Sequence, residues 1–148
     1  MGGWQEGAAG VVVLPDGRRV RGRGLRAGPP SDQLPEFGVY LTTRPHREPG
    51  WEQRWVRWPD FWLPASPGDA LAALGEAFER AADQRVEIAC DGGTGRTGTA
   101  LAVLARHAGV PASQAVAWVR THYRPRAVET PWQRRFVHRA VLGNDGEC

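Results

Sequence analysis

Apolar and polar residues alternate along several short segments in the first part of the chain, as they do in β-strands. Residues 11–23, VVVLPDGRRVRGR, place a Pro-Asp-Gly turn between two such runs and predict a β-hairpin. Further strands are expected at 37–43 and 85–90, while 51–64 is expected to be a short strand that runs into a structured loop. The pattern therefore predicts strands before helices.

Helical spacing of apolar residues dominates the second half. Ser66 is a candidate N-cap followed by Pro67, and the spacing beyond it predicts a helix to about Asp83. A second helix is expected from Gly95, closed by Gly109, with two more at about 112–122 and 130–141. A strand that feeds a glycine turn and a helix predicts an α/β fold. The residues expected to face the core are Leu71, Leu74, Phe78, Ala81, Leu101, Leu104, Ala105, Ala108, Ala115, Val116, Val119, Phe136, Val137, Ala140 and Val141.

Length and composition narrow the class of protein. With 148 residues the chain is expected to form one domain, residues 1–148. It contains no run of eighteen apolar residues, and its first residues lack the blocks of a signal peptide, so a soluble, cytoplasmic protein is expected. The two cysteines, Cys90 and Cys148, argue against a structural disulfide because the second ends a polar tail. The scattered histidines show no zinc-binding spacing.

Arginine supplies all of the basic charge, since the sequence contains no lysine and has a net charge of +3. A Walker A loop is thereby excluded, and phosphorylated or polyanionic partners are favoured. Arg19, Arg21 and Arg23 fall on one face of the predicted hairpin. We interpret them as a solvated strand face rather than a nucleic-acid-binding stripe, so nucleic acid is not an expected partner.

The sequence CDGGTGRTG, residues 90–98, connects a predicted strand to a predicted helix. Its small residues allow successive N–H groups to point into one concavity, which binds a tetrahedral anion. The helix N-terminus and the guanidinium fork of Arg96 add to this anion site. Cys90 lies at the base, where the same field stabilises a thiolate. An anion site that holds a nucleophile indicates catalysis.

Other interpretations use the same residues. Gly93, Gly95 and Gly98 match the dinucleotide fingerprint, but no second strand with an acidic end follows at the required distance. Alternatively, the loop binds phosphate while Cys90 is an ordinary buried strand residue, or Arg96 only caps the turn.

Two further motifs accompany the first. Residues 58–64 read WPDFWLP, and residues 129–143 read ETPWQRRFVHRAVLG. With Cys-x5-Arg-Thr-Gly at 90–98, the chain resembles the cysteine-dependent protein tyrosine and dual-specificity phosphatases, and is most similar to their small bacterial members. The resemblance implies a central, mainly parallel sheet flanked by helices, with the hairpin added at the N-terminus.

The resemblance also implies roles for individual residues. Cys90 attacks phosphorus and forms a cysteinyl-phosphate, while Asp60, on a mobile loop, protonates the leaving oxygen and later activates water. Thr97 assists departure of the thiolate, and Trp58 anchors the loop. Gln133 either orients the hydrolytic water or completes a capping box with Thr130. The phosphate-binding residues are Asp91, Gly92, Gly93, Thr94, Gly95 and Arg96.

The resemblance implies that no metal or other cofactor is needed. No membrane partner is expected, because the sequence has no long apolar run. The expected partner is a phosphorylated protein or a small phosphate monoester, with phosphate, sulfate or vanadate able to occupy the anion site. Three positions depart from the family pattern: Ala89 replaces the usual histidine, Asp91 adds a negative charge, and Glu129 replaces the first glutamine. Phosphotyrosine or mixed phosphoprotein substrates, a nucleotide, sugar or inositol phosphate, and a catalytically weak phosphate-binding module therefore all remain open.

Overall fold

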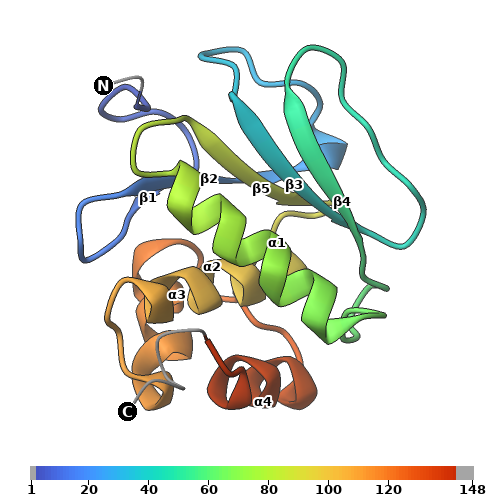
Figure 1. The fold of residues 1–148 in the computed structure, drawn as a ribbon, viewed down its shortest axis with the longest axis vertical. Helices are drawn as coiled ribbons and strands as arrows, with labels where there is room; N and C mark the ends of the chain where they lie inside the picture. The colour runs from blue at the N-terminus through green and yellow to red at the C-terminus, as the bar shows by residue number, and fades with distance from the viewer. Residues whose placement is uncertain (1–2, 143–148) are drawn as a thin grey trace.

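The structure is a computed structural model that describes residues 3–142. Cys148 and the polar tail named above lie outside the described residues. A five-stranded sheet and four α-helices form the fold, and Figure 1 shows how they are arranged. The strands are β1 (Val11–Val13), β2 (Arg19–Gly24), β3 (Phe37–Thr42), β4 (Glu52–Arg57) and β5 (Val86–Cys90). The α-helices are α1 (Pro67–Arg80), α2 (Gly95–His107), α3 (Ala115–His122) and α4 (Pro131–Arg139), with short 3-10 helices η1 (Leu25–Ala27) and η2 (Ala112–Gln114).

The sheet has the strand order β1-β2-β5-β3-β4. Only β1 and β2 pair antiparallel, whereas β2, β5, β3 and β4 run parallel. The β1–β2 connection turns at Gly17, whose φ of 95° suits a residue without a Cβ. The expected N-terminal hairpin and the mainly parallel sheet are therefore confirmed.

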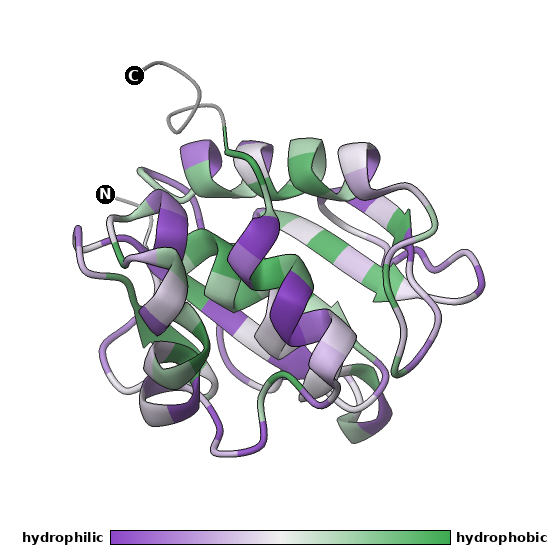
Figure 2. Cartoon of the chain, turned by 90° about the horizontal axis from the view of Figure 1, so that it is seen from below, coloured by the Kyte–Doolittle hydropathy of each residue, from purple (hydrophilic) through white to green (hydrophobic). Residues whose placement is uncertain are grey.

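The helices cover the apolar face of this sheet. Helix α1 packs on β3 and β4, and α2 packs on β2 and β5, with α3 and α4 against α2. Alternate strand residues point toward them, among them Val20, Ile88 and Val39, all fully buried. In Figure 2, helix α4 faces the viewer and is largely hydrophilic on that side. Burial of the apolar strand face against α1 and α2 forms the core.

The opposite face of the sheet carries a buried charged cluster. Glu87 is fully buried and accepts hydrogen bonds from Arg23 Nε (2.8 Å), Arg23 Nη2 (2.8 Å) and the hydroxyl of Tyr40 (2.8 Å). Arg21 Nη2 lies 3.2 Å from the same carboxylate. The interpretation of Arg21 and Arg23 as a solvated strand face was therefore wrong. Parallel pairing places Arg21 directly beside Glu87, so the arginines neutralise a buried carboxylate instead of facing water.

Several helix boundaries also differ from expectation. Helix α1 ends at Arg80, three residues early, and the segment at 112–122 divides into η2 and α3. Helix α4 ends at Arg139 because Ala140 adopts an extended conformation with ψ of 130°. Val141 is therefore 72% exposed, and its prediction as a core residue was wrong.

The carboxyl ends of the parallel strands meet at one edge of the sheet. The turn after Cys90, the loop after β4 and the segment after Gly24 all begin there. This edge is where open α/β sheets bind ligands. Within residues 3–142, no helix has the length and apolar character needed to cross a lipid bilayer.

Candidate active site

The glycine-rich turn wraps around the sulfur of Cys90. The backbone N–H of Gly93 donates to Cys90 Sγ at 3.2 Å, and the hydroxyl of Thr97 donates to the same sulfur at 3.1 Å. The cysteine side chain ends β5 and Thr97 lies in the first turn of α2. Two donors thus converge on one buried sulfur, and hydrogen bonds of this kind are stronger when the acceptor carries a charge. The predicted cradle, residues 90–96, is thus formed around the sulfur of Cys90.

The outer side of the cradle is held by the segment after α3. The hydroxyl of Tyr123 donates to Gly93 O (2.6 Å), and Arg124 Nη1 donates to Gly92 O (3.0 Å) and to Thr94 Oγ1 (3.0 Å). Burial, with the nearby Cys90 adding to it and Arg124 opposing it, raises the pKa of Tyr123 to about 12, so this phenol stays a donor. These bonds hold the backbone carbonyls of Gly92 and Gly93 from outside the cradle. No side chain is therefore needed at the centre of the cradle to fix the loop.

Gly93 illustrates why glycine is needed in the cradle. Its φ is 75°, in the left-handed region that residues with a Cβ rarely adopt. A Cβ there would also lie 2.6 Å from the backbone nitrogen of Gly24. The close approach of β2 to the cradle therefore depends on this glycine.

Arg96 is the buried cation of the site, with 1% of its surface exposed. Its Nη1 donates to Trp58 O at 2.9 Å, and its Nη2 lies 3.4 Å from a carboxylate oxygen of Asp60 and of Asp91. Its Nε is buried and has no hydrogen-bond partner among the described residues. An unsatisfied buried donor on a guanidinium is costly, and an oxyanion in the cradle would satisfy it.

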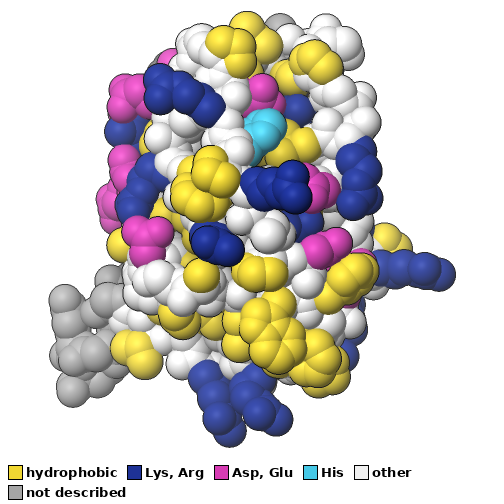
Figure 3. Space-filling view, turned by 90° about the vertical axis from the view of Figure 1, so that its right-hand side faces the viewer, with side chains coloured by type: hydrophobic (Ala, Val, Ile, Leu, Met, Phe, Trp, Pro, Cys, Tyr) yellow, Lys and Arg dark blue, Asp and Glu magenta, His cyan; other side chains and the backbone are white. Residues whose placement is uncertain are grey.

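The Trp-Pro-Asp segment, residues 58–64, lies against the cradle and is called the acid loop below. Trp58 is fully buried, and its indole N–H donates to Trp62 O at 2.8 Å. Trp132 from α4 donates from its indole to Phe61 O at 2.6 Å. Figure 3 shows hydrophobic side chains gathered below the end of β4, where the acid loop meets α4. The structure therefore brings Trp58 and Asp60 to the cradle, as the sequence predicts.

Of the two roles predicted for Gln133, the structure shows the capping box with Thr130. Its amide oxygen accepts from the N–H groups of Glu129 (3.0 Å) and Thr130 (3.2 Å), which completes the capping box of α4. Its amide nitrogen donates to Trp62 O at 3.2 Å. The capping box is therefore confirmed, and Gln133 ties α4 to the acid loop. It does not line the cavity of Cys90.

A cavity of about 280 Å³ opens above Cys90. It is lined by Arg26, Asp60, Phe61, Cys90, Gly92, Thr94, Gly95, Arg96 and Glu129. Asp91 is absent from this lining, because its side chain borders a separate cavity with Arg44 and His46. Within residues 3–142, no group of three His, Cys, Asp or Glu side chains is placed to hold a metal ion.

Three residues that line this cavity, Arg26, Phe61 and Glu129, were not predicted as site residues from the sequence. Glu129 extends over the cradle so closely that a Cβ on Gly95 would collide with its carboxylate. Burial is the main cause that raises the pKa of Glu129, and repulsion from Asp60 adds to it. The attraction of Arg96 opposes both effects. The replacement of the family's first glutamine was the signal for Glu129. Arg26 belongs to no local sequence motif. It reaches the cavity because the parallel register of β2 and β5 pairs Gly24 with Cys90.

Comparison with known proteins agrees with this geometry. A cysteine at the base of a strand–loop–helix cradle, with a buried arginine above it, defines a cysteine-dependent phosphatase. The family model described as protein-tyrosine phosphatase matches residues 34–143. The chain belongs to the protein-tyrosine phosphatase family.

Solved structures give the same result. The crystal structure of Tk-PTP in the active form has a TM-score of 0.62 and 28% identity, covering 72% of this chain and 80% of that one. A glycine-to-alanine mutant form of Tk-PTP has a TM-score of 0.60 and 29% identity, covering 69% of this chain and 73% of that one. The crystal structure of PTPMT1 has a TM-score of 0.49 and 15% identity, covering 70% of this chain and 73% of that one. A comparison with curated proteins gives no significant match.

Proposed function

We propose that the protein hydrolyses aryl phosphate monoesters, with phosphotyrosine in proteins as the substrate class, through a cysteinyl-phosphate intermediate. One observation carries the proposal: Cys90 Sγ receives two hydrogen bonds at the base of a cavity that is also lined by Arg96, whose Nε is unpartnered. A phosphoryl group placed there meets the nucleophile on one side and the guanidinium on the other.

In the first step, Cys90 Sγ attacks phosphorus, an S–P bond forms and the P–O bond to the leaving group breaks. Asp60 donates its carboxyl proton to that oxygen. The position of its carboxylate, 3.4 Å from Arg96 Nη2 and inside the cavity, supports this role. Arg96 and the backbone N–H groups of the cradle hold the three other oxygens, whose charge they balance.

In the second step, water attacks phosphorus, the S–P bond breaks and Asp60 takes the proton from the water. Thr97 donates its hydrogen bond to the departing thiolate, at the 3.1 Å separation seen here. Gln133 acts on this step only through the acid loop in this arrangement, because its amide is bound to Trp62 O. Glu129, whose side chain does line the cavity, stands at the sequence position of the first glutamine of the family pattern.

The substrate class rests on the aromatic side of the cavity. Phe61 lines it, is 52% exposed, and has a φ of 58°, a strained conformation that the acid loop holds in place. An aromatic ring at the mouth favours an aryl ester by stacking. A small-molecule phosphate is the alternative substrate. It is included in the test because Ala89 and Glu129 depart from the family pattern.

The test is phosphate release from p-nitrophenyl phosphate, a phosphotyrosine peptide, a phosphoserine peptide and a panel of nucleotide, sugar and inositol phosphates, without added metal. We expect Cys90→Ser to abolish turnover and Asp60→Asn to reduce kcat by about 100-fold or more. A thiophosphate species trapped on the wild-type protein by rapid acid quench would establish the intermediate. Turnover by Cys90→Ser equal to wild type would refute the mechanism, and a best substrate without an aromatic ring would refute the substrate class.

A further inference from the structure

The residue that follows Asp60 has an unusual backbone conformation. Phe61 has a φ of 58°, in the left-handed region that an aromatic residue rarely adopts. Its backbone N–H donates to Asp60 Oδ1 at 3.0 Å, so the orientation of this peptide fixes one oxygen of the carboxyl group. The same oxygen lies 3.4 Å from Arg96 Nη2. The direction in which Asp60 presents its carboxyl group to the cavity therefore depends on the backbone of Phe61.

Helix α4 supports this conformation from outside the acid loop. The side chain of Phe61 is 52% exposed, so its packing contributes little to holding the strained φ. The carbonyl of Phe61, by contrast, accepts a hydrogen bond of 2.6 Å from Trp132 Nε1. Within residues 3–142, this is the hydrogen bond that joins the Phe61 backbone to a segment beyond the acid loop. A strained conformation persists only where its surroundings determine it, and the indole of Trp132 is part of those surroundings.

Trp132 is itself fixed by the first turn of α4. It follows Pro131 directly and precedes Gln133, whose capping box with Thr130 defines the start of the helix. Its ring packs against Trp62, with ring centroids 5.2 Å apart. The donor therefore stands on a rigid helix start rather than on a second loop, as precise positioning requires.

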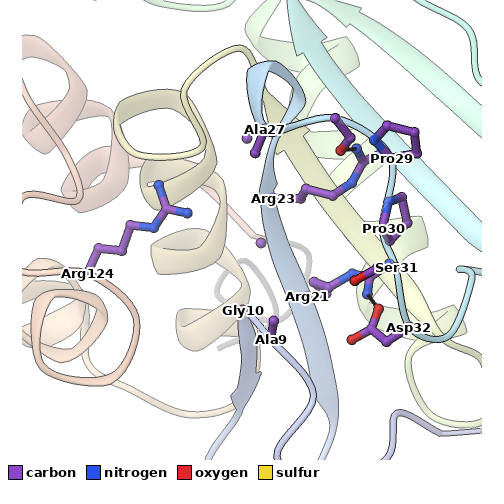
Figure 4. A pocket seen from close by; sticks show the side chains of 13 residues that line it. Ala9, Gly10, Arg21, Arg23, Ala27, Pro29, Pro30, Ser31, Asp32 and Arg124 are labelled. Atoms are coloured by element: carbon purple, nitrogen blue, oxygen red, sulfur yellow. Dashed lines mark hydrogen bonds and ion pairs between the residues drawn. The ribbon is translucent and has the colours of Figure 1, made fainter.

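The acid loop and the cradle are held by different parts of the molecule. Figure 4 shows Arg124 on the opposite side of β2 from Arg21 and Arg23. Arg124 follows α3 and donates to Gly92 O of the cradle, whereas the donor to the acid loop comes from α4. Loss of the Trp132 indole is therefore expected to loosen the acid loop while the cradle keeps its own hydrogen bonds.

We infer that Trp132 is a positioning residue for proton transfer: its indole N–H fixes the Phe61 carbonyl, and with it the carboxyl group of Asp60. The step concerned is the first one, in which the P–O bond breaks and the proton of Asp60 passes to the leaving oxygen. This inference rests on the proposed function. Attack by Cys90 does not involve the indole, so Trp132 matters in proportion to how strongly the leaving oxygen needs a proton. A tyrosine phenol, with a pKa of about 10, leaves poorly as an anion, so its esters depend on Trp132 most.

The experiment compares kcat/KM for two aryl phosphates whose phenols differ in acidity, phenyl phosphate and 2,4-dinitrophenyl phosphate. This parameter covers the steps up to cleavage of the P–O bond. Trp132→Phe keeps an aromatic ring beside Trp62 and removes the donor. We expect it to lower kcat/KM for phenyl phosphate by about tenfold to a hundredfold. For 2,4-dinitrophenyl phosphate the loss should be less than about twofold, because dinitrophenolate departs without a proton. Both values come from one protein sample, so partial unfolding cancels in their ratio.

Trp55→Phe is the matched control. Trp55 on β4 is 36% exposed, against 39% for Trp132, and its indole also donates to a backbone carbonyl, that of Thr42 at 3.3 Å. The same substitution there should leave the ratio of the two substrates unchanged. A second measurement places Trp132→Phe in the Asp60→Asn protein. The additional loss for phenyl phosphate should then be less than about twofold, because the acid to be positioned is already missing.

The inference is overturned if Trp132→Phe lowers kcat/KM for both substrates equally or changes neither. It is also overturned if the effect on phenyl phosphate is as large in the Asp60→Asn protein as in the wild type. Failure of the proposed function has a different signature. The wild-type protein would then hydrolyse neither substrate, or Cys90→Ser would be as active as the wild type.

Discussion

At the residue scale, the hydrogen bond from Thr97 to the sulfur matters most for the second chemical step, the hydrolysis of the cysteinyl-phosphate. Thr97 is fully buried and directs its hydroxyl to Cys90 Sγ, which carries most charge when the thiolate departs. We predict that Thr97→Val slows hydrolysis of the intermediate by about tenfold to a hundredfold, from the loss of a hydrogen bond to a charged group. Stopped-flow kinetics with p-nitrophenyl phosphate should then show a burst of nitrophenol near one equivalent before a slow steady state.

A matched control lies two residues further along the same helix. Thr99 is also buried, and its hydroxyl donates to Gly95 O at 2.7 Å instead of to sulfur. Thr99→Val should therefore not create the burst, and Thr97→Ser should restore wild-type kinetics. A burst in Thr99→Val of the same size would assign the effect to general loosening of α2.

Glu129 gives the site its own pH dependence. Its raised pKa means that it protonates at a higher pH than an ordinary glutamate, and above that pKa it is a carboxylate beside the phosphate dianion. We predict that Glu129→Gln raises kcat/KM about fivefold at about pH 7, where the repulsion of about 1 kcal/mol is present, and changes it little at about pH 4. A pH–rate profile of both proteins checks this. A variant slower than wild type throughout the range would show that the carboxylate acts in the reaction instead.

The residues of the site differ in how far the sequence could predict them. Cys90 and Arg96 belong to one contiguous motif, so their proximity follows from the chain itself. Arg26 reaches the cavity only through the pairing of β2 with β5, which no local pattern encodes. The alternatives for Gln133 could not be separated, because a capping glutamine and a cavity glutamine have the same sequence spacing.

At the element scale, the buried charges on the outer face of the sheet join β2, β3 and β5. Glu87 is the shared acceptor, and its carboxylate holds Arg21, Arg23 and Tyr40 together. We predict that Glu87→Gln lowers the free energy of unfolding by about 3–5 kcal/mol, because two buried guanidinium groups lose their counter-charge. Urea unfolding followed by tryptophan fluorescence measures the change.

The control for this prediction is an exposed ion pair of similar composition. Glu76 on α1 pairs with Arg54 and Arg80 in partly solvated positions, so Glu76→Gln should cost less than about 1 kcal/mol. If Glu87→Gln does not fold, Tyr40→Phe removes one hydrogen bond to the same carboxylate and should cost about 1.5–3 kcal/mol. A loss below about 1 kcal/mol in both Glu87→Gln and Tyr40→Phe would contradict the assigned role of the cluster.

The same cluster explains where prediction of the elements succeeded and where it failed. Strands and helices follow from local periodicity, and the hairpin follows from its Pro-Asp-Gly turn. Burial of a charged strand face does not follow from local periodicity. Alternating arginines have the same sequence pattern whether they face water or a carboxylate on a strand about sixty residues away. The end of α4 was missed for a related reason. Ala140 and Val141 continue the apolar pattern, but the backbone turns extended at Ala140.

At the scale of the whole molecule, charge is distributed unevenly along the chain. Residues 92–142 contain eight arginines and a single acidic residue, Glu129. These residues form α2, α3 and α4 and the outer wall of the cradle, so net positive charge is concentrated in the helical part of the chain beside the active site. Fields of this kind raise the rate of encounter with an anionic substrate more than they strengthen the bound complex.

An ionic-strength series distinguishes this long-range field from the short-range contacts of the cradle. For a phosphotyrosine peptide with acidic neighbours, we predict that kcat/KM falls about threefold to tenfold between about 20 mM and about 500 mM sodium chloride, while kcat changes less than about twofold. The reason is that screening acts on charges beyond a Debye length, whereas Arg96 is buried against the bound phosphoryl group. The same peptide with lysine neighbours should show a shallower or inverted slope. Equal slopes for both peptides would mean that the salt acts on the cradle itself, by anion competition at Arg96, and that the arginine-rich half does not steer the substrate.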